Sequence, residues 1–260
     1  MNLGIRGRTA FVSASSQGLG LACAESLVRE GVSVTLNGRS AEKLQAAASE
    51  LCRRIEGAKV GFVVADLTTE EGRGRILSAV PEVDILVNNN AGPPPGQLED
   101  WNEAALLTAM GANMIPAVQL MRVYIPGMKA RRFGRIVNIT SAMVKSPHYD
   151  MGLSTSARAA LTAISKAIST SVAADNVTIN NILPERIDTP RQEFMVKRMM
   201  AQQGIDRDEA RRRIASTIAA KRLGRPEEVG DACAFLCSAQ ASYISGQNLQ
   251  LDGGSYEGLI

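Results

Sequence analysis

The chain has 260 residues, of which 45% are hydrophobic, 4% aromatic and 21% charged, and its formal net charge at pH 7 is +3. A chain of this length buries roughly 70–75% of its unfolded surface, so it needs neither metal nor disulfide cross-links for stability. The small positive charge argues against nucleic-acid binding and suits a mild preference for anionic ligands.

The amino-terminal region leads directly into an apolar run, Thr9-Ala10-Phe11-Val12, without the basic start, apolar stretch and cleavage site of a secretion signal. We find no apolar run long enough to cross a membrane, and we expect a cytoplasmic protein. The cysteines Cys23, Cys52, Cys233 and Cys237 contain no CxxC pair, which favours four reduced thiols in the core over a redox or metal-binding role.

Apolar β-branched runs alternate with longer helical patterns along the whole chain, which indicates one α/β domain with a parallel sheet and helices on both faces. The seven predicted strands lie near residues 8–13, 32–37, 59–64, 83–88, 134–140, 176–183 and 248–251. The predicted helices lie near residues 19–30, 40–55, 69–80, 113–131, 152–173 and 226–238, with further helical turns near 100–110. Residues 190–223 fit no strand–helix pair, and we interpret this charged, helical segment as a mobile lid over the site.

The turn after the first predicted strand reads SASSQGLG over residues 13–20, and a helix begins by Leu19. This strand–turn–helix order aims backbone N–H groups and the helix dipole at an anion, which favours dinucleotide binding over an ordinary turn. The residues predicted to form this cradle are Ser13, Ser15, Ser16, Gly18, Leu19 and Gly20.

The second predicted strand ends Leu36-Asn37-Gly38-Arg39-Ser40, with no acidic residue at its tip. A carboxylate at this place binds the ribose 2′-hydroxyl of NAD, whereas a cation suits the 2′-phosphate of NADP. Arg39 can donate two parallel hydrogen bonds to a phosphate. NADP(H) is therefore favoured over NAD(H); the alternative is a solvated arginine at a helix start.

Two later motifs complete a pattern with the glycine turn: residues 88–92 read NNNAG, and residues 224–254 read GRPEEVGDACAFLCSAQASYISGQNLQLDGG. Together the three motifs resemble the short-chain dehydrogenase/reductases, most nearly their 3-oxoacyl-acyl-carrier-protein reductase-like branch. The resemblance implies a Rossmann-type doubly wound sheet, oxidoreduction of CH–OH or C=O groups, and a homotetramer. The chain departs from the family at Ala14, where relatives have the first glycine of the turn, and the turn is expected to be slightly stiffer.

The resemblance also assigns further cofactor contacts. Asp66 and Leu67 match the pair that contacts adenine, although Asp66 would also serve as the N-cap of the next helix. Asn90 and Gly92 match the turn that braces the sheet and borders the nicotinamide-side ribose.

The catalytic positions of the family are only half filled. In relatives a serine is followed thirteen residues later by Tyr-x-x-x-Lys, but counting from Ser141 gives Ser154 and Arg158. Ser141 matches the serine that hydrogen-bonds the substrate oxygen, and Asn113 matches the asparagine that holds a water of the proton relay. Ser154 is too short and too weakly acidic to replace a phenol, whereas Arg158 can still bind ribose hydroxyls but carries no transferable proton.

Two neighbouring segments offer replacements for the missing acid. Tyr149 or His148, on the loop after Ser141, would serve as a substitute proton donor, unless this loop with its Lys145 is only substrate wall or surface.

Residues 183–189 read LPERIDT where relatives have Pro-Gly after the sixth strand. The backbone of Ile187 and the side chain of Thr189 match the contacts to the nicotinamide carboxamide. Glu185 and Arg186 form a surface ion pair in one interpretation. In the other, they alter the polarity of the substrate that the site accepts, or Glu185 supplies a carboxylate for proton transfer.

We interpret the chain as an NADP(H)-dependent oxidoreductase that transfers a hydride between the nicotinamide and a carbonyl or hydroxyl substrate by an atypical proton route. The alternatives are a cofactor-binding regulatory or low-activity protein, and a site for non-redox chemistry. The substrate is a small molecule or is linked to an acyl carrier, and the pattern indicates no metal. The basic residues that would dock an acidic carrier, or form a solvated face, are Lys129, Arg131, Arg132, Arg135, Arg211, Arg212 and Arg213.

Overall fold

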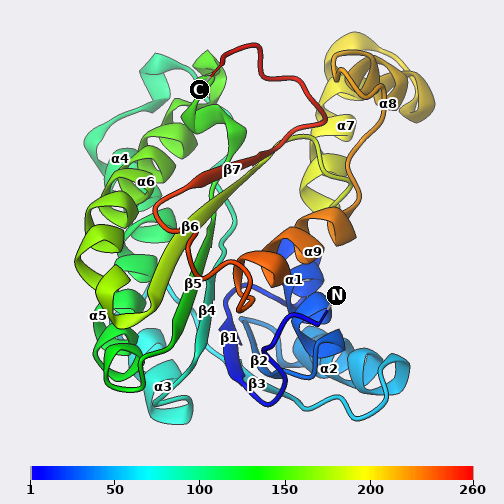
Figure 1. The fold of residues 1–260 in the computed structure, drawn as a ribbon. Helices are drawn as coiled ribbons and strands as arrows, with labels where there is room; N and C mark the ends of the chain where they lie inside the picture. The colour runs from blue at the N-terminus through cyan, green and yellow to red at the C-terminus, as the bar shows by residue number, and fades with distance from the viewer. Residues whose placement is uncertain (1, 260) are drawn as a thin grey trace.

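A sheet of seven parallel strands forms the centre of the computed structural model, in which residues 2–259 are described (Figure 1). The strand order is β3-β2-β1-β4-β5-β6-β7. The strands are β1 (Thr9–Val12), β2 (Ser33–Gly38), β3 (Val60–Val64), β4 (Ile85–Asn88), β5 (Gly134–Ile139), β6 (Val177–Pro184) and β7 (Asn248–Leu251). The order reverses direction between β1 and β4, and the predicted doubly wound parallel sheet is confirmed.

Helices cover both faces of this sheet (Figure 1). One layer contains α1 (Gly18–Arg29), α2 (Ala41–Arg54) and α9 (Pro226–Leu236). The opposite layer contains α3 (Glu70–Ala79), α4 (Glu103–Asn113), α5 (Ile115–Ala130) and α6 (Gly152–Val172). Short 3-10 turns are η1 (Leu98–Asp100), η2 (Ala142–Val144), η3 (Tyr149–Met151) and η4 (Ala173–Asp175).

Successive side chains of the strands enter different halves of the core. Ala10 and Val12 of β1 lie in the cluster beneath α1, α2 and α9, whereas Phe11 between them lies in the cluster beneath α3, α5 and α6. This alternation follows from the two-residue period of a strand. Because both faces are covered, the strands read largely as apolar runs, although β5 also buries Arg135 and Asn138, and β6 also buries Asn180 and Asn181.

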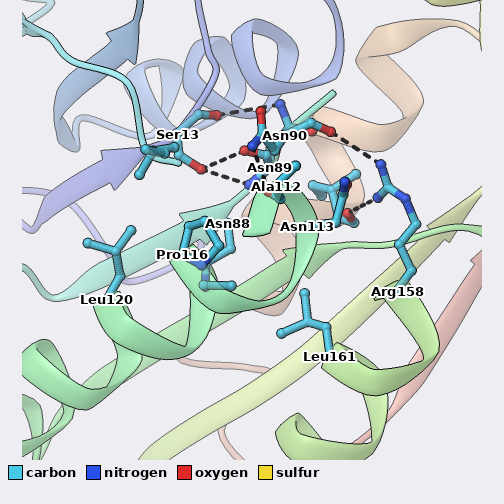
Figure 2. Close-up of a pocket in the computed structure, with 13 residues that line it drawn as sticks. Ser13, Asn88, Asn89, Asn90, Ala112, Asn113, Pro116, Leu120, Arg158 and Leu161 are labelled. Atoms are coloured by element: carbon cyan, nitrogen blue, oxygen red, sulfur yellow. Dashed lines mark hydrogen bonds between the residues drawn. The ribbon is translucent and has the colours of Figure 1, made fainter. Parts of the chain in front are cut away.

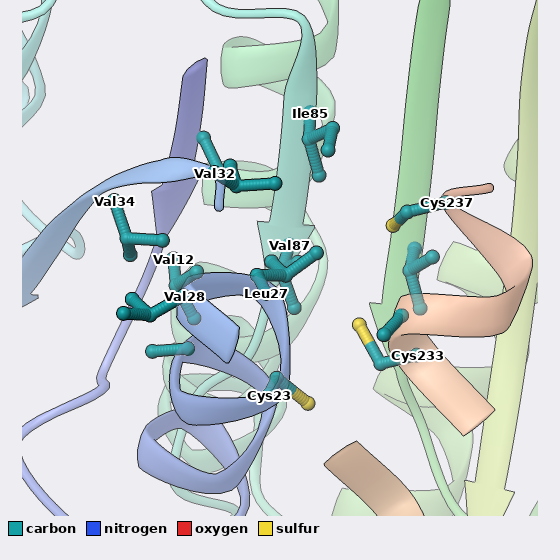
Figure 3. Close-up of a cluster of buried hydrophobic side chains, with 14 of the residues drawn as sticks. Val12, Cys23, Leu27, Val28, Val32, Val34, Ile85, Val87, Cys233 and Cys237 are labelled. Atoms are coloured by element: carbon teal, nitrogen blue, oxygen red, sulfur yellow. The ribbon is translucent and has the colours of Figure 1, made fainter. Parts of the chain in front are cut away.

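The cysteines only partly follow the expectation of four core thiols. Cys23 of α1 and Cys233 and Cys237 of α9 are buried, and their side chains lie between these two helices (Figure 3). The neighbouring Cys23 and Cys237 thiols, together with burial, raise the pKa of Cys233. Cys52 is exposed, which corrects the prediction, because the buried stripe of α2 ends at Leu51 and leaves the next position facing outward.

The helices α4 and α5 form one nearly continuous region that is more apolar than the sequence analysis recognised. By length and composition alone, Glu103–Ala130 is long and apolar enough to cross a membrane. The mean hydropathy of its most apolar 18-residue window is 1.4, and 33% of that window is buried. This corrects the statement that no run is long enough, but a helix that covers a sheet passes the same test, so the evidence for a membrane is weak. Leu107 and Val123 remain exposed on the two helices.

The segment between β6 and α9 forms α7 (Pro190–Gln203) and α8 (Arg207–Ser216), which stand apart from the two helical layers in Figure 1. An isolated parallel bridge joins Ile187 to Gly224, so both ends of the segment are fixed at one place. Val196, Ala210 and Ile214 give the segment a small apolar cluster of its own. The segment is helical, as expected, and its movement as a lid stays a prediction.

Candidate active site

The turn after β1 contains two residues in the left-handed region of backbone space. Gly18 has a φ of 62° and Ala14 a φ of 45°. Left-handed backbone costs an L-residue roughly 1–2 kcal/mol, so Ala14 holds strain in addition to the stiffness expected from its sequence position. Gly20 is required by close approach, because a Cβ there would lie 2.5 Å from the carbonyl oxygen of Ala14 and 2.8 Å from Nδ2 of Asn89.

Two serines hold this turn in place. The Ser13 hydroxyl donates to the carbonyl oxygen of Asn89 and accepts from its N–H, both at 2.8 Å (Figure 2). The Ser15 hydroxyl donates to the carbonyl oxygen of Val12 at 2.6 Å and accepts from the N–H of Asn37 at 3.0 Å. Both serine side chains are therefore engaged inside the protein, and they position the turn.

The amino terminus of α1 has the features of an anion site. Its N-cap, Gln17, makes no side-chain capping hydrogen bond, and its first turn contains no acidic residue. By contrast, α2, α3, α4, α7 and α8 each have a side-chain cap. Ser16, Gly18 and Leu19 are partly exposed at this end of α1. An uncapped helix terminus offers N–H groups to phosphate oxygens, so these residues fit the pyrophosphate of a dinucleotide.

Arg39 directly follows β2, and its side chain is 81% exposed. Its single ion pair within residues 2–259 is a 4.0 Å contact to Asp66. The backbone and hydroxyl of Thr68 donate to Asp66, and these hydrogen bonds, with a smaller contribution from Arg39, lower the pKa of that carboxyl. The N-cap of α3 is Thr69, so Asp66 does not cap this helix. Leu67 is buried beside it, and Arg39 is free to bind a phosphate.

The turn after β4 is fixed to the end of α4. Nδ2 of Asn90 donates to the carbonyl oxygen of Ala112 at 2.6 Å, and Nδ2 of Asn113 donates to that of Ala91 at 3.3 Å. Both amides hold the backbone that leads to Gly92. Figure 2 shows Asn90 and Asn113 side by side above the sheet.

A small cavity lies beneath this turn (Figure 2). Its volume is about 20 Å³, and its lining includes Asn88, Asn113 and Arg158. Oδ1 of Asn88 is buried and has no hydrogen-bond partner among residues 2–259. A cavity of this size with polar walls has room for about one water molecule.

Ser141 lies just beyond β5 and caps η2. Its Oγ accepts a hydrogen bond from the N–H of Met143 at 3.2 Å. The hydroxyl hydrogen has no acceptor within the described residues, so it is available to an oxygen atom of a ligand. Ser154, in the first turn of α6, is only 6% exposed, and its Oγ lies 3.0 Å from the position that a Cβ of Gly92 would take.

Arg158 uses most of its donors on the protein itself. Nη1 donates to the carbonyl oxygens of Ile139 and Thr140, both at 2.8 Å, and Nη2 donates to that of Asn90 at 3.2 Å. Nε donates to Oγ of Ser154 at 3.3 Å. Arg158 therefore joins the ends of β4 and β5 to α6, and its expected contact with a ribose stays a prediction.

Tyr149 lies away from Ser141 and Ser154. Its hydroxyl oxygen accepts a hydrogen bond from the N–H of Leu98 at 3.3 Å, and its ring centroid is 5.7 Å from that of Trp101. The tyrosine is exposed, as is the preceding His148. The structure brings Tyr149 to η1, so a role as proton donor would require movement of the loop.

The exit from β6 faces the glycine turn. Thr189 caps α7 by accepting from the N–H of Gln192 at 3.4 Å, and its hydroxyl donates to the carbonyl oxygen of Ile187 at 3.3 Å. The Cβ of Thr189 and Cδ of Pro190 lie 4.0 and 3.9 Å from the position that a Cβ of Gly18 would take. A dinucleotide bound at the turn therefore meets the start of α7.

Glu185 and Arg186 form an ion pair at 3.7 Å, in which both side chains are mostly buried. Glu185 also lines a second cavity, together with Glu228 of α9 and Gln250 of β7. The pair therefore lies beneath the end of the α7–α8 segment and is not an exposed surface pair.

Sequence reasoning missed two residues near the site. Nη2 of Arg191, in the first turn of α7, donates to the carbonyl oxygen of Pro93 at 3.1 Å. The sequence signal that could have identified Arg191 is its position two residues after Thr189, a predicted cofactor contact. The sequence analysis instead treated residues 190–223 as one charged segment. Tyr256 lies with its ring 5.1 Å from Nζ of Lys145, and no sequence pattern linked the chain end to that loop.

Comparisons with known proteins agree with this geometry. A protein-family model described as enoyl-(acyl carrier protein) reductase matches residues 13–256. The NADPH-dependent reductase BacG of Bacillus subtilis is 31% identical over 256 residues, which cover 97% of this chain and 99% of the relative. The chain belongs to the short-chain dehydrogenase/reductase superfamily. Its members are NAD(P)H-dependent oxidoreductases that act on CH–OH and C=O groups.

Other relatives also match this short-chain dehydrogenase/reductase over nearly its whole length. The 3-oxoacyl-[acyl-carrier-protein] reductase FabG of Aquifex aeolicus is 29% identical over 266 residues, covering 98% of this chain and 100% of its own. The crystal structure of L-sorbose reductase from Gluconobacter frateurii, complexed with NADPH and L-sorbose, matches with a TM-score of 0.93 at 31% identity and covers 100% of both chains. The fold of this superfamily member therefore matches that of its relatives along the whole chain.

Proposed function

We propose that this short-chain dehydrogenase/reductase is an NADP(H)-dependent oxidoreductase that interconverts a carbonyl and a hydroxyl compound. The observation that carries the proposal is the uncapped amino terminus of α1 beside the exposed Arg39. One feature suits a pyrophosphate and the other a 2′-phosphate. BacG and the L-sorbose reductase are described with NADPH, which supports the same preference.

The residues of the site divide the chemistry between them. NADPH, when bound, supplies the hydride for the substrate carbon. The free hydroxyl hydrogen of Ser141 bonds the substrate oxygen and orients it. Arg158 places a fixed positive charge beside that oxygen and stabilises the negative charge that develops on it. Because neither Ser154 nor Arg158 is a suitable acid, we propose that the proton reaches the oxygen from water.

We favour a small-molecule substrate over one linked to an acyl carrier. The basic residues near α5 and β5 are largely neutralised, since Lys129 and Arg132 both pair with Asp175, and Arg131 pairs with Glu82. The basic residues of α8 are paired in the same way, with Asp188 and Glu209. These pairs leave little free positive charge to attract an acidic carrier.

A second candidate is a cofactor-binding regulatory protein with little turnover. It is supported by the hydrogen bonds of Arg158 to three backbone carbonyl oxygens. These bonds use guanidinium donors at the position where the family resemblance expects a lysine that contacts the cofactor and the proton donor.

The deciding experiment is a turnover screen with the purified protein. Ketones, aldehydes, oxo acids and sugars are tested with NADPH, and alcohols with NADP⁺, while NADPH binding is measured in parallel by calorimetry. Turnover that is lost in Ser141→Ala supports the oxidoreductase. Tight NADPH binding without turnover of any compound supports the regulatory protein instead.

A further inference from the structure

Arg191 is a cation without an anionic partner. Nη2 of Arg191 donates a hydrogen bond to the carbonyl oxygen of Pro93 at 3.1 Å, and the guanidinium lies 5.3 Å from the ring of Phe194. A guanidinium carries several N–H donors, and within residues 2–259 the others of Arg191 have no acceptor and no carboxylate in ion-pair distance. Arg191 therefore has donors to offer to a ligand.

This makes Arg191 different from the other arginines of the same segment. Each of those has a carboxylate partner: Arg198 pairs with Asp150, Arg207 with Glu193, Arg211 with Asp188, Arg212 and Arg213 with Glu209, and Arg222 with Glu228. Every other arginine of the segment therefore has a counterion, supplied by the segment or by its neighbours, and within residues 2–259 only Arg191, which contacts the turn after β4, has none.

A second cation, Arg158, contacts the same turn as Arg191, since its Nη2 lies 3.4 Å from the position of a Cβ at Gly92 while Arg191 bonds the adjacent Pro93. Burial, followed by the charge of Arg191, lowers the pKa of Arg158 to about 10. Burial and the neighbouring Arg198 lower the pKa of Arg191 in turn. Arg158 bonds only oxygens of the backbone and of Ser154, so it adds charge without a counterion. Two cations that are close together and partly shielded from water raise the free energy of the folded protein unless an anion binds between them.

We infer that the substrate carries a carboxylate, as an oxo acid or the corresponding hydroxy acid does, and that Arg191 binds this group. The identity of the ligand as substrate rests on the proposed function. A guanidinium and a carboxylate form two parallel hydrogen bonds, which are stronger than the single bond to the neutral carbonyl of Pro93. Nε2 of Gln192, in the same helical turn, is buried without a partner and adds an unused donor to this end of α7.

The contacts of Arg191 favour the substrate over the cofactor as the source of the anion. The start of α7 meets the glycine turn through Thr189 and Pro190, which lie next to Gly18. Arg191 instead contacts Pro93 and the vicinity of Arg158, on the side where Ser154 and the turn at Gly92 lie. Because Arg191 belongs to α7, a bound carboxylate would also hold the α7–α8 segment against the turn that follows β4.

The test compares acids with their neutral esters. Steady-state kinetics are measured for pyruvate, acetoacetate and their methyl esters with the wild type, with Arg191→Gln, and with Arg207→Gln as a matched loss of a lid arginine. We expect Arg191→Gln to raise KM for the acids roughly 10- to 100-fold, since a charge-assisted hydrogen bond is lost. KM for the esters and the Kd for NADPH stay within about twofold, Arg191→Lys retains part of the acid preference, and Arg207→Gln behaves as the wild type.

Three results would overturn the inference. A wild type without preference for the acids, or an equal effect of Arg191→Gln on acids and esters, removes the carboxylate site while the oxidoreductase stands. A fall in NADPH affinity with no change in the acid-to-ester ratio would assign Arg191 to the cofactor pyrophosphate.

The inference remains testable when no compound is turned over. Binding of pyruvate and acetoacetate is then measured by thermal shift in the presence of NADPH. Stabilisation of the wild type but not of Arg191→Gln supports a carboxylate site in a protein that has lost the proposed reaction. Absence of any stabilisation overturns the carboxylate site, whereas the proposed oxidoreductase is judged separately by the turnover screen.

Discussion

Nε of Arg158 donates a hydrogen bond to Oγ of Ser154 across one turn of α6, at 3.3 Å. These two residues occupy the positions at which the related enzymes have the tyrosine and lysine of their catalytic motif. The pair has become a bracing element, since Arg158 also bonds the ends of β4 and β5. Gly92 packs closely against Ser154, since a Cβ added at Gly92 would lie 3.0 Å from Oγ of Ser154.

The first prediction restores the missing acid. The double change Ser154→Tyr with Arg158→Lys is expected to increase turnover of simple ketones with NADPH by about 10²–10⁴-fold, because a positioned acid contributes that much. The single change Ser154→Tyr gives less, since Arg158 fixes a different geometry. Stopped-flow or steady-state NADPH oxidation measures the effect.

The control for this rescue is the triple variant that also carries Ser141→Ala, in which the gain should disappear. Because the double variant loses hydrogen bonds to backbone carbonyls, circular dichroism must show that it is folded. A folded double variant that binds NADPH and shows no gain would mean that the pocket has been rebuilt beyond this motif.

The second prediction concerns cofactor choice. Arg39→Ala should remove most of a preference for NADPH over NADH, because a charge-assisted contact to a phosphate contributes roughly 1.5–3 kcal/mol. The Kd values of both cofactors are measured by calorimetry. Arg53→Ala, which removes an exposed arginine paired with Glu50, serves as the control. Equal affinities of the wild type for the two cofactors would contradict the assignment.

The third prediction tests the close approach at Gly20. A methyl group there would lie 2.5 Å from the carbonyl oxygen of Ala14, so Gly20→Ala should lower the free energy of unfolding by roughly 1–3 kcal/mol and abolish NADPH binding. Gly74→Ala is the matched control, since nothing lies within 4 Å of its added Cβ and an alanine within α3 is favourable. Urea unfolding followed by fluorescence compares the two, and equal stabilities would refute the packing argument.

The fourth prediction concerns acid stability. The Arg222 side chain and the N–H of Arg225 lower the pKa of Glu228 to about 2. A carboxyl whose pKa is lowered in the folded state stabilises the protein at pH values above its ordinary pKa. This contribution is lost as the pH falls from about 4.5 towards about 2. Glu228→Gln should therefore cost roughly 0.2–1 kcal/mol near neutrality, as exposed pairs do, and nothing at low pH. Urea titrations across this range measure it, with Glu227→Gln as the control.

The fifth prediction is a homotetramer, which we propose from the exposed apolar residues of α4 and α5. Val123→Arg should reduce the mass measured by light scattering at micromolar concentration, because a charge is placed in a buried contact between subunits. Leu98→Arg, at an apolar position outside these helices that is 62% exposed against 45% for Val123, should leave the mass unchanged. A monomeric wild type would exclude the tetramer.

The sequence alone determined the sheet. The seven strands were located from runs that are mostly apolar, because a strand buried on both faces favours apolar residues, as in Ala10, Phe11 and Val12. The glycine turn was equally readable, since left-handed backbone and close packing at Gly18 and Gly20 tolerate few other residues.

Only the tertiary structure decided where the polar side chains of the site are directed. The expected contact of Arg158 with a ribose stays a prediction, but only the structure shows its donors on the carbonyl oxygens of Ile139 in β5 and of Asn90 just after β4, because strands that end side by side leave such oxygens unpaired. Arg191 could not be singled out among the arginines of its segment until their carboxylate partners were known. Hydrogen bonds and ion pairs of this kind join residues far apart in the chain, so their pairing depends on the fold and leaves no local pattern in the sequence.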